Sequence, residues 1–182
     1  MGEIRSPSPV LLVIAVSSRY AEAFDWAREH AQERYGPIAL ASEVFAFTET
    51  NYYAATMGAD LQKQFLAFER FIDPAELIGI KRETNAWESA YAALDRHPEP
   101  RPLNLDPGYM TLAKLVLAST KDHAHRIYLG RGIFAEVTLF FRHGGWQTRE
   151  WTFPDYQRAD YQQFFTACRD WLHDRQREGG PA

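Results

Sequence analysis

Side chains able to do chemistry are densest in one short segment, residues 119–126. This segment reads Ser-Thr-Lys-Asp-His-Ala-His-Arg and holds two hydroxyls, two permanent cations, a carboxylate and two imidazoles. Lysine offers a point charge and arginine a two-pronged donor to phosphate or carboxylate, and hydroxyls can complete such a site. The segment therefore predicts an anion site with Lys121 and Arg126 as its cations. The alternative is a solvated loop between core elements.

Two histidines in this segment raise the alternative of a metal. His123 and His125 lie two residues apart, so on an extended chain they point the same way and could share a metal with Asp106, Glu136 or Asp155. Only two ligands are defined locally, and histidines are more often exposed or satisfied in a core. We therefore assign no metal ligand, and any cofactor is unknown.

A β-hairpin is expected directly after the segment. Strands at His125–Leu129 and Ile133–Phe141 flank Gly130-Arg131-Gly132, a three-residue connection with glycines for positive φ. A pairing of Leu129 with Ile133 predicts an ion pair between Arg126 and Glu136 on one face of the sheet. Alternation predicts an apolar face of Ile127, Leu129, Ala135, Val137 and Leu139, and a polar-aromatic face of Arg126, Tyr128 (opposite Phe134), Glu136 and Thr138.

A third strand, Trp146–Phe153, is expected after the turn His143-Gly144-Gly145 and completes a C-terminal three-stranded meander. A two-residue turn would add Trp151 and Phe153 to the polar-aromatic face. A three-residue turn would reverse their direction, so the face occupied by residues 151–156 stays open.

The rest of the chain predicts the elements that position these groups. Apolar patterns indicate strands at Val10–Ser17, Glu43–Thr48, Leu61–Ile72 and Arg101–Leu105, and helices at Tyr20–Tyr35, Tyr109–Leu117 and Arg158–Arg175. The sequence Asp106-Pro107-Gly108 predicts a turn between two of these elements.

One further helix has a clear start. Asp73 is a suitable N-cap, Pro74 occupies the first helical position and Glu76 completes a capping box. The helix is expected to run to Leu94. It places Lys81, Asn85 and Glu88 together on one flank.

These patterns predict an α+β fold with a mixed or antiparallel sheet, the C-terminal meander and about three main helices. A chain of 182 residues fits a single domain over 1–182, with a loose tail at 1–9 and a frayed end at 177–182. The one cysteine, Cys168, follows a helical apolar pattern and is expected to be buried. It also excludes a disulfide within the chain and indicates a reducing compartment.

Charge and hydropathy exclude several partners. The net charge of −4 is unlike the broad basic surface that binds nucleic acid non-specifically. The longest apolar run, Val10–Val16, is far shorter than the roughly 20 residues that span a bilayer. We therefore expect a cytoplasmic protein with no membrane segment. No P-loop, H-E-x-x-H or G-x-S-x-G motif occurs, and the glycines at 130 and 132 continue into a strand, unlike a dinucleotide-binding turn.

Four stretches carry a family resemblance: Asn104–Tyr109, Ser119–Asp122, His125–Leu129 and Trp151–Tyr156. With them the chain resembles the prokaryotic domain-of-unknown-function family numbered 4416, over nearly its whole length. The resemblance implies one compact domain and no established activity. The family has glutamate before Met-Gly where this chain has Thr56, so no acid role is expected there, and His123 also departs from the pattern.

The resemblance and the residue chemistry together give a list of candidates. The candidates for acid–base catalysis are Asp106, His125 and Glu136, and those for ligand binding are Asn104, Tyr109, Lys121 and Arg126, with Lys81 and Asn85 from the capped helix. They predict an enzyme or binding protein for a small anionic metabolite, nucleotide-like or phosphorylated. The alternative is a noncatalytic protein–protein interaction or self-association module, motivated by the 14% aromatic content, and a homo-oligomer fits that alternative.

Overall fold

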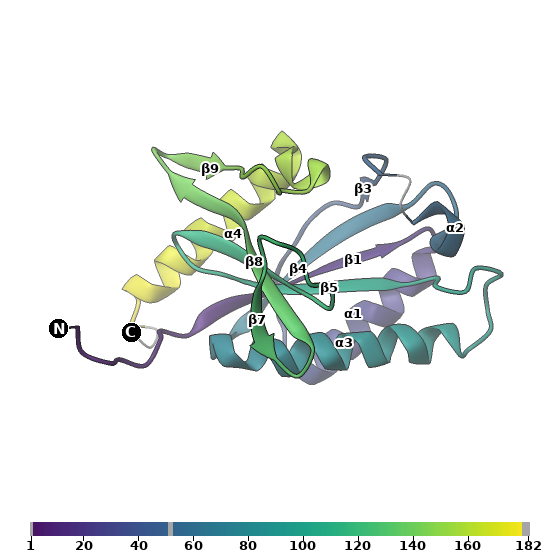
Figure 1. Cartoon of the computed structure of the whole chain (residues 1–182), viewed down its shortest axis with the longest axis horizontal. Coiled ribbons are helices and arrows are strands. Elements are labelled where there is room, and N and C mark those ends of the chain that lie inside the picture. Colours follow the sequence, from purple (N-terminus) through teal and green to yellow (C-terminus); the bar gives the residue numbers. More distant parts are fainter. Residues whose placement is uncertain (1, 51–52, 180–182) are drawn as a thin grey trace.

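The fold is built on an open antiparallel sheet with helices packed on it (Figure 1). The computed structural model describes residues 2–50 and 53–179. Nine strands of the described residues form this sheet, in the order β2-β4-β1-β5-β6-β8-β7, with β3 paired to β4 and β9 paired to β8. The pairs are all antiparallel. Helices α1 and α3 lie on one side of the sheet and α4 lies on the other. The predicted α+β class is confirmed.

The strands are β1 (Val10–Ser18), β2 (Ile38–Ala41), β3 (Phe45–Ala46), β4 (Gln62–Ile72), β5 (Asn104–Met110), β6 (Lys114–Ser119), β7 (Ile127–Gly130), β8 (Ile133–Arg142) and β9 (Gly145–Gln147). The helices are α1 (Ala21–Tyr35), α2 (Ala54–Met57), α3 (Leu77–Ala92) and α4 (Ala159–Arg177), with short 3₁₀ helices η1 (Pro74–Glu76) and η2 (Pro154–Gln157).

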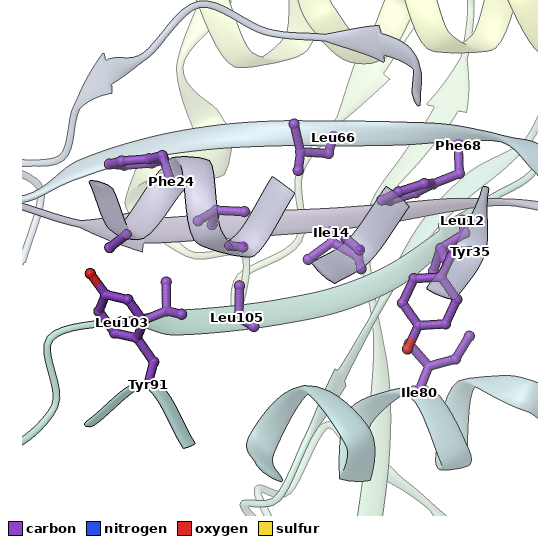
Figure 2. Packing of buried hydrophobic residues seen from close by; sticks show 14 of the residues in the cluster. Leu12, Ile14, Phe24, Tyr35, Leu66, Phe68, Ile80, Tyr91, Leu103 and Leu105 are labelled. Carbon is purple, nitrogen blue, oxygen red and sulfur yellow. The ribbon is translucent and has the colours of Figure 1, made fainter. Parts of the chain in front are cut away.

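The apolar run Val10–Val16 lies in β1, the strand between β4 and β5, and every residue of β1 is buried. Leu12 and Ile14 point to α1 and α3, where they meet Phe68 of β4 and Tyr35 of α1 (Figure 2). Leu11, Val13 and Ala15 point to α4. A strand with helices on both faces needs apolar residues at every position, which explains the unbroken run.

Helix α4 covers the second face with Tyr161, Phe165, Cys168 and Leu172. Cys168 is buried as predicted, and burial raises the pKa of its thiol. The capping box at the start of α3 is also confirmed. The Asp73 carboxylate accepts a hydrogen bond from Ala75 N at 2.8 Å, and Glu76 accepts one from Asp73 N at 2.9 Å.

The predicted turn at Asp106-Pro107-Gly108 and the helix Tyr109–Leu117 are wrong, because this stretch forms β5 and β6. A Cβ atom at Gly108 would lie 2.3 Å from the Val116 carbonyl oxygen, so this glycine permits a close approach of two strands and does not form a turn. In β6, Leu115 and Leu117 face α4, whereas Val116 and Ala118 pack below α3. An apolar strand covered on both faces resembles a helical pattern.

The C-terminal meander of β7, β8 and β9 is confirmed, but β9 is shorter than the predicted third strand, and residues 148–153 leave the sheet. The predicted pair Tyr128–Phe134 is present. The pairing of Leu129 with Ile133 is wrong, because an irregularity places Gly130 opposite Ile133. Gly130 has a φ of +128°, which its lack of a Cβ allows.

The predicted apolar face is also partly wrong. Ala135 and Val137 pack toward α3, but Ile127 and Leu129 are exposed because β7 is an edge strand with no described element covering them. A register shift between β6 and β8 turns Leu139 into the core beneath α4.

The N-terminal half holds a further difference. Of the predicted strand Glu43–Thr48 only Phe45–Ala46 is a strand, and β2 at Ile38–Ala41 was not predicted. Residues 2–9 form no helix or strand. Met1 of the predicted tail and residues 180–182 of the predicted frayed end lie outside the described residues. Within the described chain, no helix is both long and apolar enough to cross a membrane.

Candidate functional site

The sheet opens where β5 and β6 separate. These strands pair only between Gly108–Met110 and Leu115–Leu117, whereas the start of β5 continues to pair with β1. Pro107 marks the point of separation, since it has no N–H to offer a neighbouring strand. We call this opening the β5–β6 fork.

Side chains of α3 cap the edge of β5 inside the fork. Leu105 N donates to Glu88 Oε1 at 2.8 Å, and Lys81 Nζ donates to Leu105 O at 2.8 Å. The backbone N–H and C=O groups of a buried strand edge need hydrogen-bond partners. Glu88 and Lys81 therefore replace the strand partner that β6 does not provide here.

A pocket of about 660 Å³ occupies the fork. Its wall includes Phe47, Glu49, Thr50 and Tyr53, Lys63 of β4, Lys81, Asn85, Glu88 and Ser89 of α3, Arg101, Asn104 and Asp106, residues 117–121 with His123, Arg126 and Glu136, and residues 153–156. Side chains from distant parts of the sequence thus meet in one cavity.

One side of the pocket is a network centred on Asp106. Lys81 Nζ lies 3.1 Å from Asp106 Oδ1, and Asn104 Nδ2 donates to Asp106 Oδ2 at 2.7 Å. Burial acts to raise the pKa of the Asp106 carboxyl, but the charges of Lys81 and Lys63, together with the hydrogen bonds from Asn104 and Lys81, outweigh burial and lower that pKa. The Asp106 side chain is 31% exposed, so an ionised carboxylate is available to the pocket.

Arg101 extends this network toward α3. Its guanidinium donates to Glu88 Oε2 at 2.9 Å and also to Asn104 Oδ1. Burial raises the pKa of the Glu88 carboxyl against the opposing charges of Lys81 and Arg101. Neither Glu88 nor Arg101 was predicted as a site residue. Glu88 shares a helix flank with Lys81 and Asn85, a signal that could have indicated it.

The opposite wall holds the predicted ion pair of Arg126 and Glu136, which is confirmed with Nε to Oε2 at 2.8 Å. His125 Nε2 also lies 3.0 Å from Glu136 Oε2, and Thr138 donates to the other oxygen. Arg126 donates further to Ser119 Oγ at 2.6 Å and to the Lys121 carbonyl at 3.0 Å. The Glu136 side chain is only 1% exposed, so these bonds fix the 119–126 loop to β8.

A second buried ion pair joins two segments 92 residues apart. Lys63 Nζ lies 2.5 Å from Asp155 Oδ2, and both side chains are buried. The Lys63 ammonium also lies 3.8 Å from the centre of the Phe47 ring. This pair was missed. A lysine in the apolar strand 61–72 was its only local signal.

The path of residues 148–157 shows which face of the sheet Trp151 and Phe153 occupy, a point that the sequence leaves open. Trp151 stacks on His125 with ring centres 5.3 Å apart, and Phe153 lies 5.9 Å from the Arg126 guanidinium. Trp151 Nε1 donates to the Val137 carbonyl at 3.1 Å. Both aromatic residues therefore lie against the polar-aromatic face, held there by a loop that has left the sheet.

Seven of the nine predicted candidates line the pocket: Lys81, Asn85, Asn104, Asp106, Lys121, Arg126 and Glu136. His125 lies behind Glu136 and is not part of the pocket wall. Tyr109 is separate, packed between two apolar clusters, where burial raises the pKa of its phenol. Among the described residues, no three His, Cys, Asp or Glu side chains are grouped as metal ligands, and His123 stacks on His125.

Comparison with known proteins gives one match. No curated protein and no solved structure matches the chain. The family model described as a domain of unknown function, DUF4416, matches residues 8–171. That range includes the whole sheet and every residue lining the pocket. The chain therefore belongs to the DUF4416 family.

Proposed function

We propose that the pocket in the β5–β6 fork binds a small anionic metabolite, as an enzyme or as a binding protein. The observation that supports this is the convergence of seven predicted residues, from α3, β5, the 119–126 loop and β8, on one cavity. Packing alone does not require so many charged groups around an open space, since buried charges are costly unless paired.

The size of the pocket favours a metabolite over a bare ion. Its volume of about 660 Å³ lies within the roughly 300–1,000 Å³ of pockets for small organic ligands. Phe153 and Tyr53 add aromatic surface to the wall. A nucleotide or another phosphorylated ring compound would use both kinds of surface.

The exposed fraction of each side chain distinguishes the groups that could contact a ligand from those that hold the pocket wall in place. Arg101 is 38% exposed, Asp106 is 31% exposed and Lys121 lies at the surface. We assign anion contacts to Arg101 and Lys121. The ionised Asp106 would accept a hydrogen bond or a proton, although its lowered pKa makes it a weak base. Arg126 and Glu136 would act mainly by holding the loop.

The test is a thermal-shift screen with nucleotides, phosphorylated metabolites and divalent ions on the parent protein, Lys121→Ala and Lys114→Ala. Lys114 lies in β6 but outside the pocket wall, so it is the matched control. A ligand should raise the melting temperature of the parent and of Lys114→Ala and should have less effect on Lys121→Ala. Equal shifts in all three proteins would reject the assigned contact.

A self-association module is the second candidate. The observation that favours it is the edge strand β7, where Ile127 and Tyr128 are 72% and 60% exposed beside Leu129. A second copy of the chain could pair with this edge. Light scattering should then give a dimer mass that Leu129→Glu reduces to that of a monomer. A monomer at all concentrations would exclude it.

A further inference from the structure

Lys63 is a buried ammonium with an incomplete set of partners. An ammonium carries three N–H donors. One goes to Asp155, and the ring centres of Phe47 and Tyr156 lie 3.8 and 5.4 Å from the ammonium, where they offer no oxygen or nitrogen acceptor. The Lys63 side chain is 6% exposed, and Lys63 lines the pocket. At least one buried donor is thus left without a hydrogen-bond partner among the described residues.

Ser17 shows a similar deficit beside it. In β1, Ser17 lies directly opposite Lys63 of β4 and Asn104 of β5, and side chains of opposed residues share one face of a sheet. Ser17 is 1% exposed, and its Oγ has no hydrogen-bond partner within the described part of the chain. Native proteins satisfy most buried polar atoms. Lys63 lines the pocket, and Ser17 lies next to it in the sheet without being part of the pocket wall, so the two deficits fall together at this end of the pocket.

Lys81 approaches from the other side of the fork. Its ammonium makes two hydrogen bonds, to Leu105 O and Asp106 Oδ1, which leaves one of three donors. Lys63, Lys81 and Asp106 all line the pocket, and the positive charges of the two ammoniums lower the pKa of the Asp106 carboxyl. Asp106 and Asp155 balance the two ammoniums and reduce the cost of their burial.

From these contacts we propose that the inner end of the pocket, at Lys63 and Lys81, is an oxyanion-binding site for a phosphate or carboxylate group of the ligand. The inference rests on the proposed function and adds the orientation of the ligand. Its anionic group would enter first and accept hydrogen bonds from the two ammoniums. The remainder would lie toward Phe153, and a further anionic group on it would reach the contacts assigned above to Arg101 and Lys121.

The experiment uses inorganic phosphate and malonate as probes, with calorimetric titration of the full chain. Lys63→Met is combined with Asp155→Asn, so that no unpaired carboxylate is left buried, and Asp155→Asn alone is the matched control because it keeps the ammonium. The double variant should lose at least about tenfold in affinity relative to Asp155→Asn, the expected effect of one charge-assisted hydrogen bond. Comparison of the probes shows which oxyanion is preferred.

A measurement on the parent protein covers the case in which the double variant does not fold. The side-chain ammonium resonance of Lys63 should shift on addition of the tighter probe, and that of Lys114 should not. Equal affinity in the double variant and its control, or an unchanged Lys63 resonance when a probe binds, would overturn the oxyanion site. If binding then depends on Lys121 alone, the proposed function stands without it. No binding by any metabolite or probe would reject both.

Discussion

The two ends of β5 lie in the same strand but have different surroundings. At Gly108–Met110 the strand lies between β1 and β6, and its backbone is paired on both sides. At Asn104–Asp106 it pairs with β1 alone, and Glu88 and Lys81 of α3 take the place of the missing strand. The paired end is core. The open end borders the pocket and carries the polar side chains.

This difference shows how two diverging strands can open a pocket whose edge is lined by charged side chains. Once β6 diverges, the free edge of β5 requires donors and acceptors, and charged side chains supply them. Their charges in turn require partners, which brings in Arg101 and Asp106. Polar networks of this kind add little net stability, but they are costly to break at a single point.

The largest loss of stability is expected from removing Lys63, whose ion pair with Asp155 lies at the pocket beside the open end of β5. Lys63→Met leaves the buried Asp155 carboxylate unpaired and should lower the free energy of unfolding by about 3–5 kcal/mol. Adding Asp155→Asn should recover a large part of the loss. Urea denaturation of the parent, single and double variants measures both steps. A double variant as unstable as Lys63→Met would mean that lost packing, not the unpaired charge, causes the effect.

The next largest loss of stability is expected at Gly108, in the paired end of β5. Gly108→Ala places a Cβ against the Val116 carbonyl, a backbone atom that cannot turn aside, and should cost about 1–3 kcal/mol. Gly79→Ala in α3 is the control. Apart from the nearby backbone of α3 itself, no atom of the described residues lies within 4 Å of its added Cβ, so the change should be neutral or stabilise by up to about 1 kcal/mol. Similar stabilities of the two variants in urea would contradict the close approach of β5 and β6.

Substitution of Glu88 tests whether side chains of α3 take over the backbone hydrogen bonds that β6 does not provide to the open end of β5. Glu88→Ala removes the acceptor for Leu105 N and the partner of Arg101, and should cost about 1–3 kcal/mol. Amide hydrogen exchange gives the local readout, because Leu105 N–H should lose protection while Tyr109 N–H, at the paired end, keeps it. Uniform loss of protection along β5 would show that the two ends are not separate.

Local patterns predicted the parts of this fold that depend on nearby residues. The apolar run of β1, the capping box of α3 and the pair of Arg126 with Glu136 are all confirmed, because each is determined by spacing within one element or hairpin. Pro107-Gly108 predicted a turn because both residues favour turns. Their actual roles depend on β6, which lies against them only in three dimensions.

The missed site residues have the same explanation. Lys63 meets Asp155 across 92 residues, so neither predicts the other without the sheet order. The sequence pattern places Arg101 in a strand, but β5 begins at Asn104, and the contacts of Arg101 with Glu88 and Asn104 become visible only once β5 lies beside α3. Charge type and density located the region of the pocket, whereas long-range pairing determined which charges face it.

A smaller, pH-dependent effect should come from Asp106. Its pKa is lower in the folded protein, so ionised Asp106 stabilises the fold above the unfolded value of 3.8, and this contribution is lost as the pH falls through the lower folded pKa. Asp106→Asn should therefore be less stable than the parent at about pH 7, with the gap closing toward about pH 2. Denaturation at both pH values measures the gap. A gap that does not depend on pH would assign the effect to the Asn104 contact geometry.

The smallest effect is expected at Leu129, outside the fork. The alternation pattern placed Leu129 and Leu139 on one apolar face, but Leu129 is exposed on the edge strand and Leu139 is fully buried beneath α4. Leu129→Ala should change the unfolding free energy by no more than about 0.5 kcal/mol, whereas Leu139→Ala, its matched control, should cost about 2–5 kcal/mol. Urea denaturation of the two variants at low protein concentration separates them. If Leu129→Ala proved as costly as Leu139→Ala, β7 would have to be covered, and the dimer formed through its edge would become the better explanation of the exposed residues.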